Sequence, residues 1–252
     1  METKIKIIDI HAHCNSSSKF DCIESEIHKR SLDFLQSEYE RLGISAGGLS
    51  YYSAVMSDEE IFLANEQLEK LSNENEKVYQ WLVLDPRKPE LFPQIRQKIN
   101  GKKVLGIKIH SRSHMYDILE YGDKIFSFAN ELGCFVAMHP DKIENMVYFA
   151  DKYPNMKLII AHLGSLEHIE AVKSAKHQNV FTDTSGGASN LNNIVEYAVE
   201  QIGSEKIFFG TDNYSGAFQI GRVKFANISE EDKQNIFYKN AKKYFKKQFE
   251  KV

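Results

Sequence analysis

The first apolar run of the chain ends in two histidines separated by one residue, and this pattern constrains the fold more than any other feature. The run 5–10 leads into Asp9-Ile-His11-Ala-His13. Side chains alternate between the two faces of a β-strand, so His11 and His13 are expected to project together from the carboxyl end of that strand. Two imidazoles placed in this way can bind one metal ion, or can simply hydrogen-bond at the strand end.

Five later segments repeat the arrangement of an apolar, β-rich run that closes on a polar residue. They are 104–110, 134–139, 157–162, 180–185 and 207–212, and they end in His110, His139, His162, Ser185 and Asp212. A TIM barrel places the carboxyl ends of its parallel strands on one rim, where the βα loops build the active site. We therefore expect these polar ends to meet.

The remaining strand candidates bring the total to eight, with helical patterns between them. The other strands are expected at 4–13, 43–52 and 78–85, and the helices at 21–42, 58–77, 89–98, 123–132, 142–153, 166–177, 191–202 and 230–249. The length of 252 residues is close to the ~250 typical of one (β/α)8 barrel. A doubly wound flavodoxin-like sheet also alternates strand and helix, but eight units favour closure. We expect one α/β TIM-barrel domain over 1–252, with its longest irregular piece at 111–121.

The charge and the cysteine content limit the cellular compartment and the classes of binding partner that we expect. The formal net charge is −3 with both signs interspersed, which gives no reason to expect a nucleic-acid or anionic-membrane surface. Three cysteines without a CxxC spacing argue against a disulfide framework. No apolar run reaches the ~18 residues of a membrane span. We expect a cytoplasmic protein that binds a small molecule, with homo-oligomer formation left open.

The order of these motifs along the chain resembles that of the amidohydrolase superfamily. The resemblance is to its amidohydrolase-related branch of aminocarboxymuconate-semialdehyde decarboxylase, aromatic-acid decarboxylases and lactone hydrolases, and spans essentially the whole chain. It is carried by DxHxH at 9–13, GIKIH at 106–110, His139, Ala-His-Leu-Gly around His162, Asp-Thr-Ser at 183–185, Gly-Thr-Asp at 210–212 and Asn-Ala-Lys-Lys-Tyr-Phe at 240–245.

The resemblance implies one divalent metal ion, with His162 close to a water at the metal. The implied ligands are His11, His13, His139 and Asp212. Imidazoles with one carboxylate and an open position suit catalytic Zn²⁺, which we expect first, with Mn²⁺, Fe²⁺ and Co²⁺ as alternatives. A metal-activated water could ionise near pH 7, and Asp212 would accept its proton.

Several other residues have both a functional and a structural interpretation. Lys108 could carry a carboxylated amine that bridges two metals, as in binuclear relatives, or could form an ion pair with a carboxylate, which we favour. Together with His110 it could contact the substrate. Arg112 could grip a substrate carboxylate through two hydrogen bonds, or could be a solvated surface residue. Asp9 is expected one pleat deeper than His11, in a structural role.

Four functions remain to be compared. The leading hypothesis is a metal-dependent hydrolase of a small carboxylate-bearing ester, lactone or amide. Its closest rival is a non-oxidative decarboxylase of an aromatic or unsaturated acid with the same ligands. A TatD-like nuclease is disfavoured by Lys108 on strand four and by the absence of a basic excess. A catalytically silent barrel is disfavoured because no ligand is missing.

Overall fold

The computed structural model describes residues 6–187, 190–213 and 215–252, which form alternating strands and helices. The strands are β1 (Ile7–Cys14), β2 (Ile44–Tyr51), β3 (Val78–Val83), β4 (Val104–Ile109), β5 (Phe135–Met138), β6 (Lys157–Ile160), β7 (Val180–Asp183) and β8 (Ile207–Phe208). The helices are α1 (Leu32–Leu42), α2 (Tyr52–Met56), α3 (Ile61–Glu74), α4 (Leu91–Lys98), α5 (Ser111–His114), α6 (Ile118–Leu132), α7 (Ile143–Lys152), α8 (Leu166–Ser174), α9 (Ile194–Ile202), α10 (Gly216–Lys224), α11 (Glu230–Gln234) and α12 (Asn240–Tyr244), with the 3₁₀ turn η2 (Ser204–Lys206) and the π-helical turn η3 (Asn235–Lys239).

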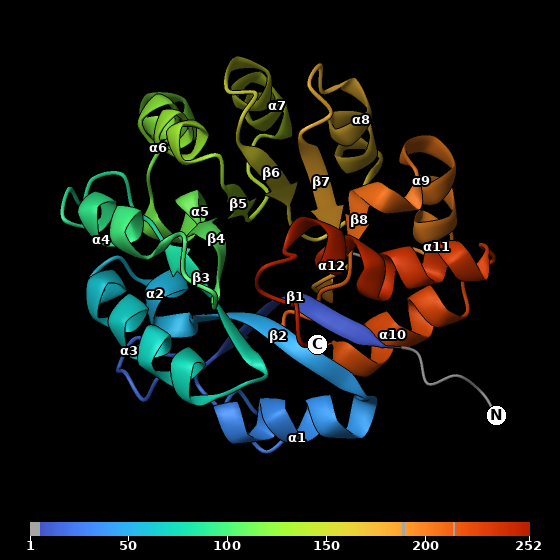
Figure 1. Cartoon of the computed structure of the whole chain (residues 1–252), viewed down its shortest axis with the longest axis horizontal. Helices are drawn as coiled ribbons and strands as arrows, with labels where there is room; N and C mark the ends of the chain where they lie inside the picture. Colours follow the sequence, from blue (N-terminus) through green and yellow to red (C-terminus); the bar gives the residue numbers. More distant parts are fainter. Residues whose placement is uncertain (1–5, 188–189, 214) are drawn as a thin grey trace.

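The eight strands form one parallel sheet in sequential order, with the helices arranged around it (Figure 1). Each strand pairs with the next, from β1 with β2 to β7 with β8. Backbone bonds from Ile10 N to Phe209 O (2.9 Å) and from Asp212 N to His11 O (2.8 Å) join the first strand to the end of the last. The chain is therefore a (β/α)8 TIM barrel, which confirms the fold expected from the sequence.

Two apolar cores hold the barrel together. One lies between the strands and the helices, and contains Ile7, Ala12 and Cys14 of β1. The other lies inside the barrel, where Ile8 and Ile10 join large side chains of the other strands. Its larger members are Tyr79, Trp81, Phe135, Phe181, Phe208, Phe245 and Phe249. The last two follow α12, so the C-terminal segment closes one end of the barrel (Figure 1).

Local signals explain where individual helices begin and end. α1 and α6 both end at a glycine in the left-handed conformation, Gly43 (φ 75°) and Gly133 (φ 61°), where a side chain would be strained. α11 begins after Ser229, whose side chain accepts a hydrogen bond from the backbone N–H of Asp232.

Two expectations about the connections are wrong, and two helices were not expected. The helix expected at 21–42 begins only at Leu32, so residues 15–31 form the longest irregular segment, which we call the β1 loop. The piece expected to be irregular at 111–121 contains α5 and the start of α6. α2 and α10 were not anticipated, because both are short helices within βα connections and their amphipathic pattern is weak.

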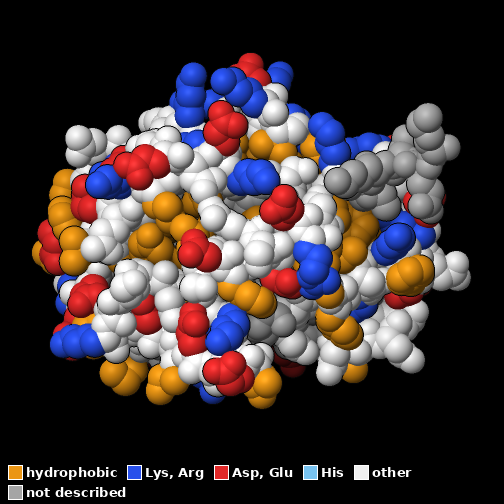
Figure 2. Space-filling model, turned by 90° about the horizontal axis from the view of Figure 1, so that it is seen from below, with side chains coloured by type: hydrophobic (Ala, Val, Ile, Leu, Met, Phe, Trp, Pro, Cys, Tyr) orange, Lys and Arg blue, Asp and Glu red, His pale blue; other side chains and the backbone are white. Residues whose placement is uncertain are grey.

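The outside of the molecule carries mixed charge. On the side seen in Figure 2, basic and acidic side chains are interspersed with apolar ones. None of the helices in the described ranges is both long and apolar enough to cross a membrane.

Candidate metal centre and active site

The ends of β1 and β8 bring two imidazoles and one carboxylate together. Nε2 of His11 lies 3.2 Å from Nε2 of His13, and Oδ1 of Asp212 lies 3.4 Å from Nε2 of His13 and 4.0 Å from that of His11. All three residues are buried. One donor atom from each lies close enough to the other two for them to share a metal ion. The alternation rule therefore placed His11 and His13 correctly.

The remaining ring nitrogens of the two histidines are held by other groups. Nδ1 of His11 lies 2.8 Å from Oδ2 of Asp183 on β7, and Nδ1 of His13 lies 2.8 Å from Oγ of Ser50 on β2. Such partners fix the ring orientation and leave Nε2 facing the centre, as at metal-binding histidines. Asp183 and Ser50 were assigned no role from the sequence, although Asp183 follows the same strand-end rule.

His162, after β6, lies on the opposite side of Asp183. Its backbone N–H donates to Oδ1 of Asp183 (3.2 Å), and its Nδ1 lies 2.9 Å from Oγ of Ser185. The Ser185 hydroxyl also lies 2.9 Å from Nδ1 of His11, so it links the two histidines. Gly186, with φ 75°, makes room for the ring, because a Cβ there would lie 2.6 Å from Nδ1 of His162.

The backbone is strained where two of these side chains leave it. His162 has φ 65° and Asp212 has φ 56°, values that non-glycine residues rarely adopt. Such residues cluster at functional sites, where the surrounding structure holds them in place. Both residues of the cluster therefore adopt an uncommon backbone conformation, which is also found at Ser17, Met115, Gln178 and Asn213.

His139 is not gathered with the other three expected metal ligands. Its Nδ1 lies 3.1 Å from Nε2 of His162, and its ring stacks on that of His110 at a centroid distance of 4.2 Å. The sets of side chains close enough to share one ion contain His11, His13 and Asp212, or His11, His162 and Asp183, among the residues described. His139 therefore lies at the rim of the cluster rather than at its centre.

Lys108 reaches the centre from β4. It is 1% exposed, and its Nζ lies 2.7 Å from Nε2 of His11. The expected ion pair is not seen, since no carboxylate among the described residues pairs with it. Burial lowers the pKa of Lys108 to about 8, against the opposing effect of Asp183 and Asp212. The ammonium is thus held in a buried site without a direct counter-ion.

Burial also keeps the imidazoles neutral. It lowers the pKa of His162 to about 4, of His110 to about 3 and of His139 to about 2, and it places that of His13 well below its usual range. Burial alone would raise the pKa of Asp183, but His11, His162 and the Ser185 bond outweigh it and bring that pKa well below its usual range. Neutral imidazoles beside an ionised carboxylate are the state in which such residues bind metals.

Asp9 does not point into the barrel as expected. Its Oδ2 accepts from the hydroxyls of Tyr39 on α1 (2.7 Å) and Thr211 (2.6 Å), and Tyr39 belongs to the core between the strands and the helices. The pairing of β1 with β2 shifts register between Asp9 and Ala12, which turns the following histidines inward. Burial raises the pKa of Asp9 to about 6, and its hydrogen bonds connect β1 to α1 and to the segment after β8.

Two arginines lie on loops that follow strands. Arg112 on α5 is exposed, and its guanidinium pairs with no residue that the structure describes. Arg30, which the sequence did not single out, closes the β1 loop, and its guanidinium lies 5.0 Å from the ring of Tyr52. That ring lies 5.3 Å from the ring of His13, and its hydroxyl is 3.5 Å from the backbone O of Asp212. Arg30 therefore stands beside the cluster.

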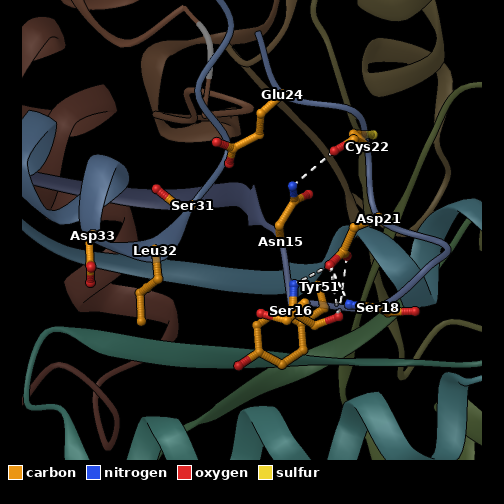
Figure 3. A pocket seen from close by; sticks show the side chains of 11 residues that line it. Asn15, Ser16, Ser18, Asp21, Cys22, Glu24, Ser31, Leu32, Asp33 and Tyr51 are labelled. Carbon is orange, nitrogen blue, oxygen red and sulfur yellow. Dashed lines mark hydrogen bonds between the residues drawn. The ribbon is translucent and has the colours of Figure 1, made fainter. Parts of the chain in front are cut away.

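A polar pocket of about 590 Å³ opens beside the β1 loop (Figure 3). Oδ2 of Asp21 accepts from the backbone N–H groups of Ser16 and Ser18, and the amide of Asn15 donates to the backbone O of Cys22. These bonds shape the loop. The lining includes none of the clustered histidines, so this pocket is distinct from the candidate metal centre.

Comparison with solved structures gives matches over almost the whole chain. The 2,6-dihydroxybenzoate decarboxylase from Rhizobium is 15% identical, with 96% of this chain and 98% of that chain covered and a TM-score of 0.76. A dihydroxybenzoic acid decarboxylase from Polaromonas sp. JS666, with bound manganese and the inhibitor 2-nitroresorcinol, is 17% identical, with 96% and 97% covered and a TM-score of 0.71. The 4-oxalomesaconate hydratase from Rhodopseudomonas palustris is 15% identical, with 97% of each chain covered and a TM-score of 0.67.

At these identities the structural matches show the shared barrel fold. No curated protein matches the chain in sequence. A family model described as amidohydrolase matches residues 8–247, which includes every strand and all the clustered side chains. The chain is therefore an enzyme of the amidohydrolase family.

Proposed function

We propose that the protein is a metal-dependent, non-oxidative decarboxylase of a small aromatic or unsaturated carboxylic acid. The observation that carries the proposal is the buried ammonium of Lys108 beside the candidate metal centre, with which no carboxylate of the described ranges forms an ion pair. A buried cation of this kind is stabilised by an anion. A substrate carboxylate would supply that anion, and the decarboxylases among the structural neighbours support the reaction class.

The metal would be held by His11, His13 and Asp212, with His139 completing the set after a small movement of its ring. The donors fit a divalent cation, because each histidine is oriented through Nδ1 and offers Nε2. The manganese in a neighbour supports a divalent ion without favouring zinc. Such an ion would polarise a substrate oxygen and offset charge that develops on it. Binding it would displace Lys108 from Nε2 of His11.

Substrate recognition would use cationic and neutral donors around this centre. Nδ1 of His110 accepts a hydrogen bond from the backbone N–H of Ser113, which leaves the proton of the neutral ring on Nε2 as a donor for substrate. Lys108 would bind the reacting carboxylate. Arg30, beside the ring of Tyr52, and Arg112 on α5 are the cationic groups proposed to bind a second electron-rich group of the substrate.

The chemical step breaks the bond between the carboxylate and its carbon. Carbon dioxide leaves, the electron pair stays on the carbon, and that carbon takes up a proton. Asp212 and His162 are the groups proposed to handle this proton, because both border the centre and His162 is connected to it through Ser185.

The rival function is hydrolysis of a carboxylate-bearing ester, lactone or amide, as first expected from the sequence. The family match favours it as a second candidate, since the same residues could take a proton from water instead. Metal-replete protein should be incubated with 2,6-dihydroxybenzoate, other aromatic acids and small lactones, with carbon dioxide release and ring opening measured in parallel. Metal-dependent carbon dioxide release supports decarboxylation. Turnover of lactones alone would refute it.

A further inference from the structure

β3 is followed by a carboxylate and an arginine that bind each other tightly. Asp85 is fully buried and accepts from the backbone N–H of Arg87 (2.9 Å), from its Nε (3.0 Å) and from its terminal Nη2 (2.6 Å). A two-point arginine–carboxylate pair fixes both position and orientation. The guanidinium of Arg87 is therefore a rigid feature of the β3 end.

The same guanidinium reaches the next loop and holds α5. Nη2 of Arg87 donates to the backbone O of His114 (2.7 Å), and the guanidinium lies 5.7 Å from the ring centre of Tyr116. Asp58, which precedes α3, lies 3.8 Å from Arg87 and 3.1 Å from Nζ of Lys88. The guanidinium of Arg87 thus contacts residues of the connections that follow β2, β3 and β4.

α5 cannot hold its own position. It has four residues, and helices this short do not persist in isolation. Its other polar contacts are few: Nε2 of His114 bonds the backbone O of Ala54, Oγ of Ser111 bonds Asp141, and Nδ1 of His114 lies 3.9 Å from Oδ2 of Asp85. The side chains of Ser111 and His114 are also buried. Nδ1 of His114 and the hydroxyl of Tyr116 are buried without a hydrogen-bond partner among the described residues. The bond from Arg87 is therefore one of a small set of polar contacts that hold α5.

His110 caps the start of α5, and α5 carries Arg112; both residues are proposed to meet the substrate. We propose that Arg87 is a positioning residue for substrate recognition, which holds α5 in register with the metal centre through its pair with Asp85. This inference rests on the proposed function insofar as α5 contacts the substrate. Arg87 itself lies behind α5 and touches neither the clustered histidines nor Asp212.

The test compares Arg87→Gln with the milder Arg87→Lys. The lysine keeps a positive charge beside Asp85 but lacks the Nη2 group that donates to the backbone O of His114. The matched control is Arg96→Lys, because Arg96 forms a similar two-point pair with Glu131 on the surface. Hydrogen exchange is measured at the amides of His114, Met115 and Tyr116, which bond within this turn. The Kd of 2,6-dihydroxybenzoate and the steady-state constants are measured with metal content as a check.

Both Arg87 variants are expected to exchange these amides about tenfold faster, and the control to exchange them at the wild-type rate. Ligand Kd and KM should rise about tenfold, with kcat and metal content nearly unchanged. Unchanged exchange in Arg87→Lys and Arg87→Gln would overturn the inference whether or not the enzyme turns over any acid. Faster exchange with unchanged ligand affinity would overturn its link to recognition. Absence of turnover in the wild type refutes only the proposed function, because the exchange comparison still decides whether Arg87 holds α5.

Discussion

Replacing Gly186 by alanine tests whether the position of His162 matters to the reaction. Gly186 has φ 75°, and the added Cβ would lie 2.6 Å from Nδ1 of His162 and 3.2 Å from its Cε1. The distance to Nδ1 is too short for a Cβ atom, so the ring must move. Because Nδ1 is the atom that lies 2.9 Å from the Ser185 hydroxyl, the move breaks the connection to His11.

A second glycine variant separates the two contributions to the loss of stability, which are backbone strain and overpacking. Gly133 has φ 61° and nothing within 4 Å of an added Cβ, so Gly133→Ala measures the backbone strain alone. That strain is about 1–2 kcal/mol. Gly186→Ala adds an overpacking term of about 1–3 kcal/mol, which gives roughly 2–5 kcal/mol in total.

The assay combines urea denaturation of both variants with kcat on the best substrate. We expect Gly186→Ala to be less stable than Gly133→Ala and to lose about 100-fold in kcat, since small displacements of a catalytic group have effects of that size. Gly133→Ala should keep wild-type kcat. Equal stability and equal kcat in the two variants would refute the role given to His162.

Three further predictions concern the charged groups of the centre. Asp212→Asn should keep the fold and lose turnover, because an amide does not accept a proton at neutral pH; near-normal kcat in the metal-replete variant would place the base elsewhere. Lys108 is expected to be unmodified, so native mass spectrometry should show no carbon-dioxide adduct, and Lys108→Ala should keep about one metal per chain while binding substrate more weakly. In metal-free protein, four histidines, His13, His110, His139 and His162, stay neutral when folded but take up protons when unfolded. The free energy of unfolding should therefore fall as the pH drops from about 6.5 towards 4, because each histidine contributes up to about 1.4 kcal/mol per pH unit and the opposing titration of Asp9 offsets only one of them; a flat profile in urea titrations would contradict the buried, neutral state.

The sequence predicts the barrel and most of the polar residues gathered at its rim, because both depend on local periodicity. Strand ends are marked by the change from apolar to polar residues, and parallel strands bring those ends together whatever the loops do. His11, His13, His162 and Asp212 are found in this way. The inward position of Lys108 follows from the same alternation.

What the sequence does not predict depends on contacts between distant segments. The register shift in β1 turns Asp9 towards Tyr39, and nothing in the local pattern marks it. The helical pattern at 21–31 is overridden because Asp21 bonds the backbone of Ser16 and Ser18 and holds an irregular loop. Arg30 reaches the site only through that loop.

The metal content of purified protein tests the central claim most directly. Wild type and His13→Ala should be loaded with Mn²⁺ or Zn²⁺, freed of excess ion and analysed for metal, with His177→Ala as the control because His177 is exposed and outside the cluster. The account predicts about one equivalent in wild type and control, and a small fraction of it in His13→Ala. Full occupancy in His13→Ala, or no metal in wild type, would contradict a metal centre at the ends of β1 and β8.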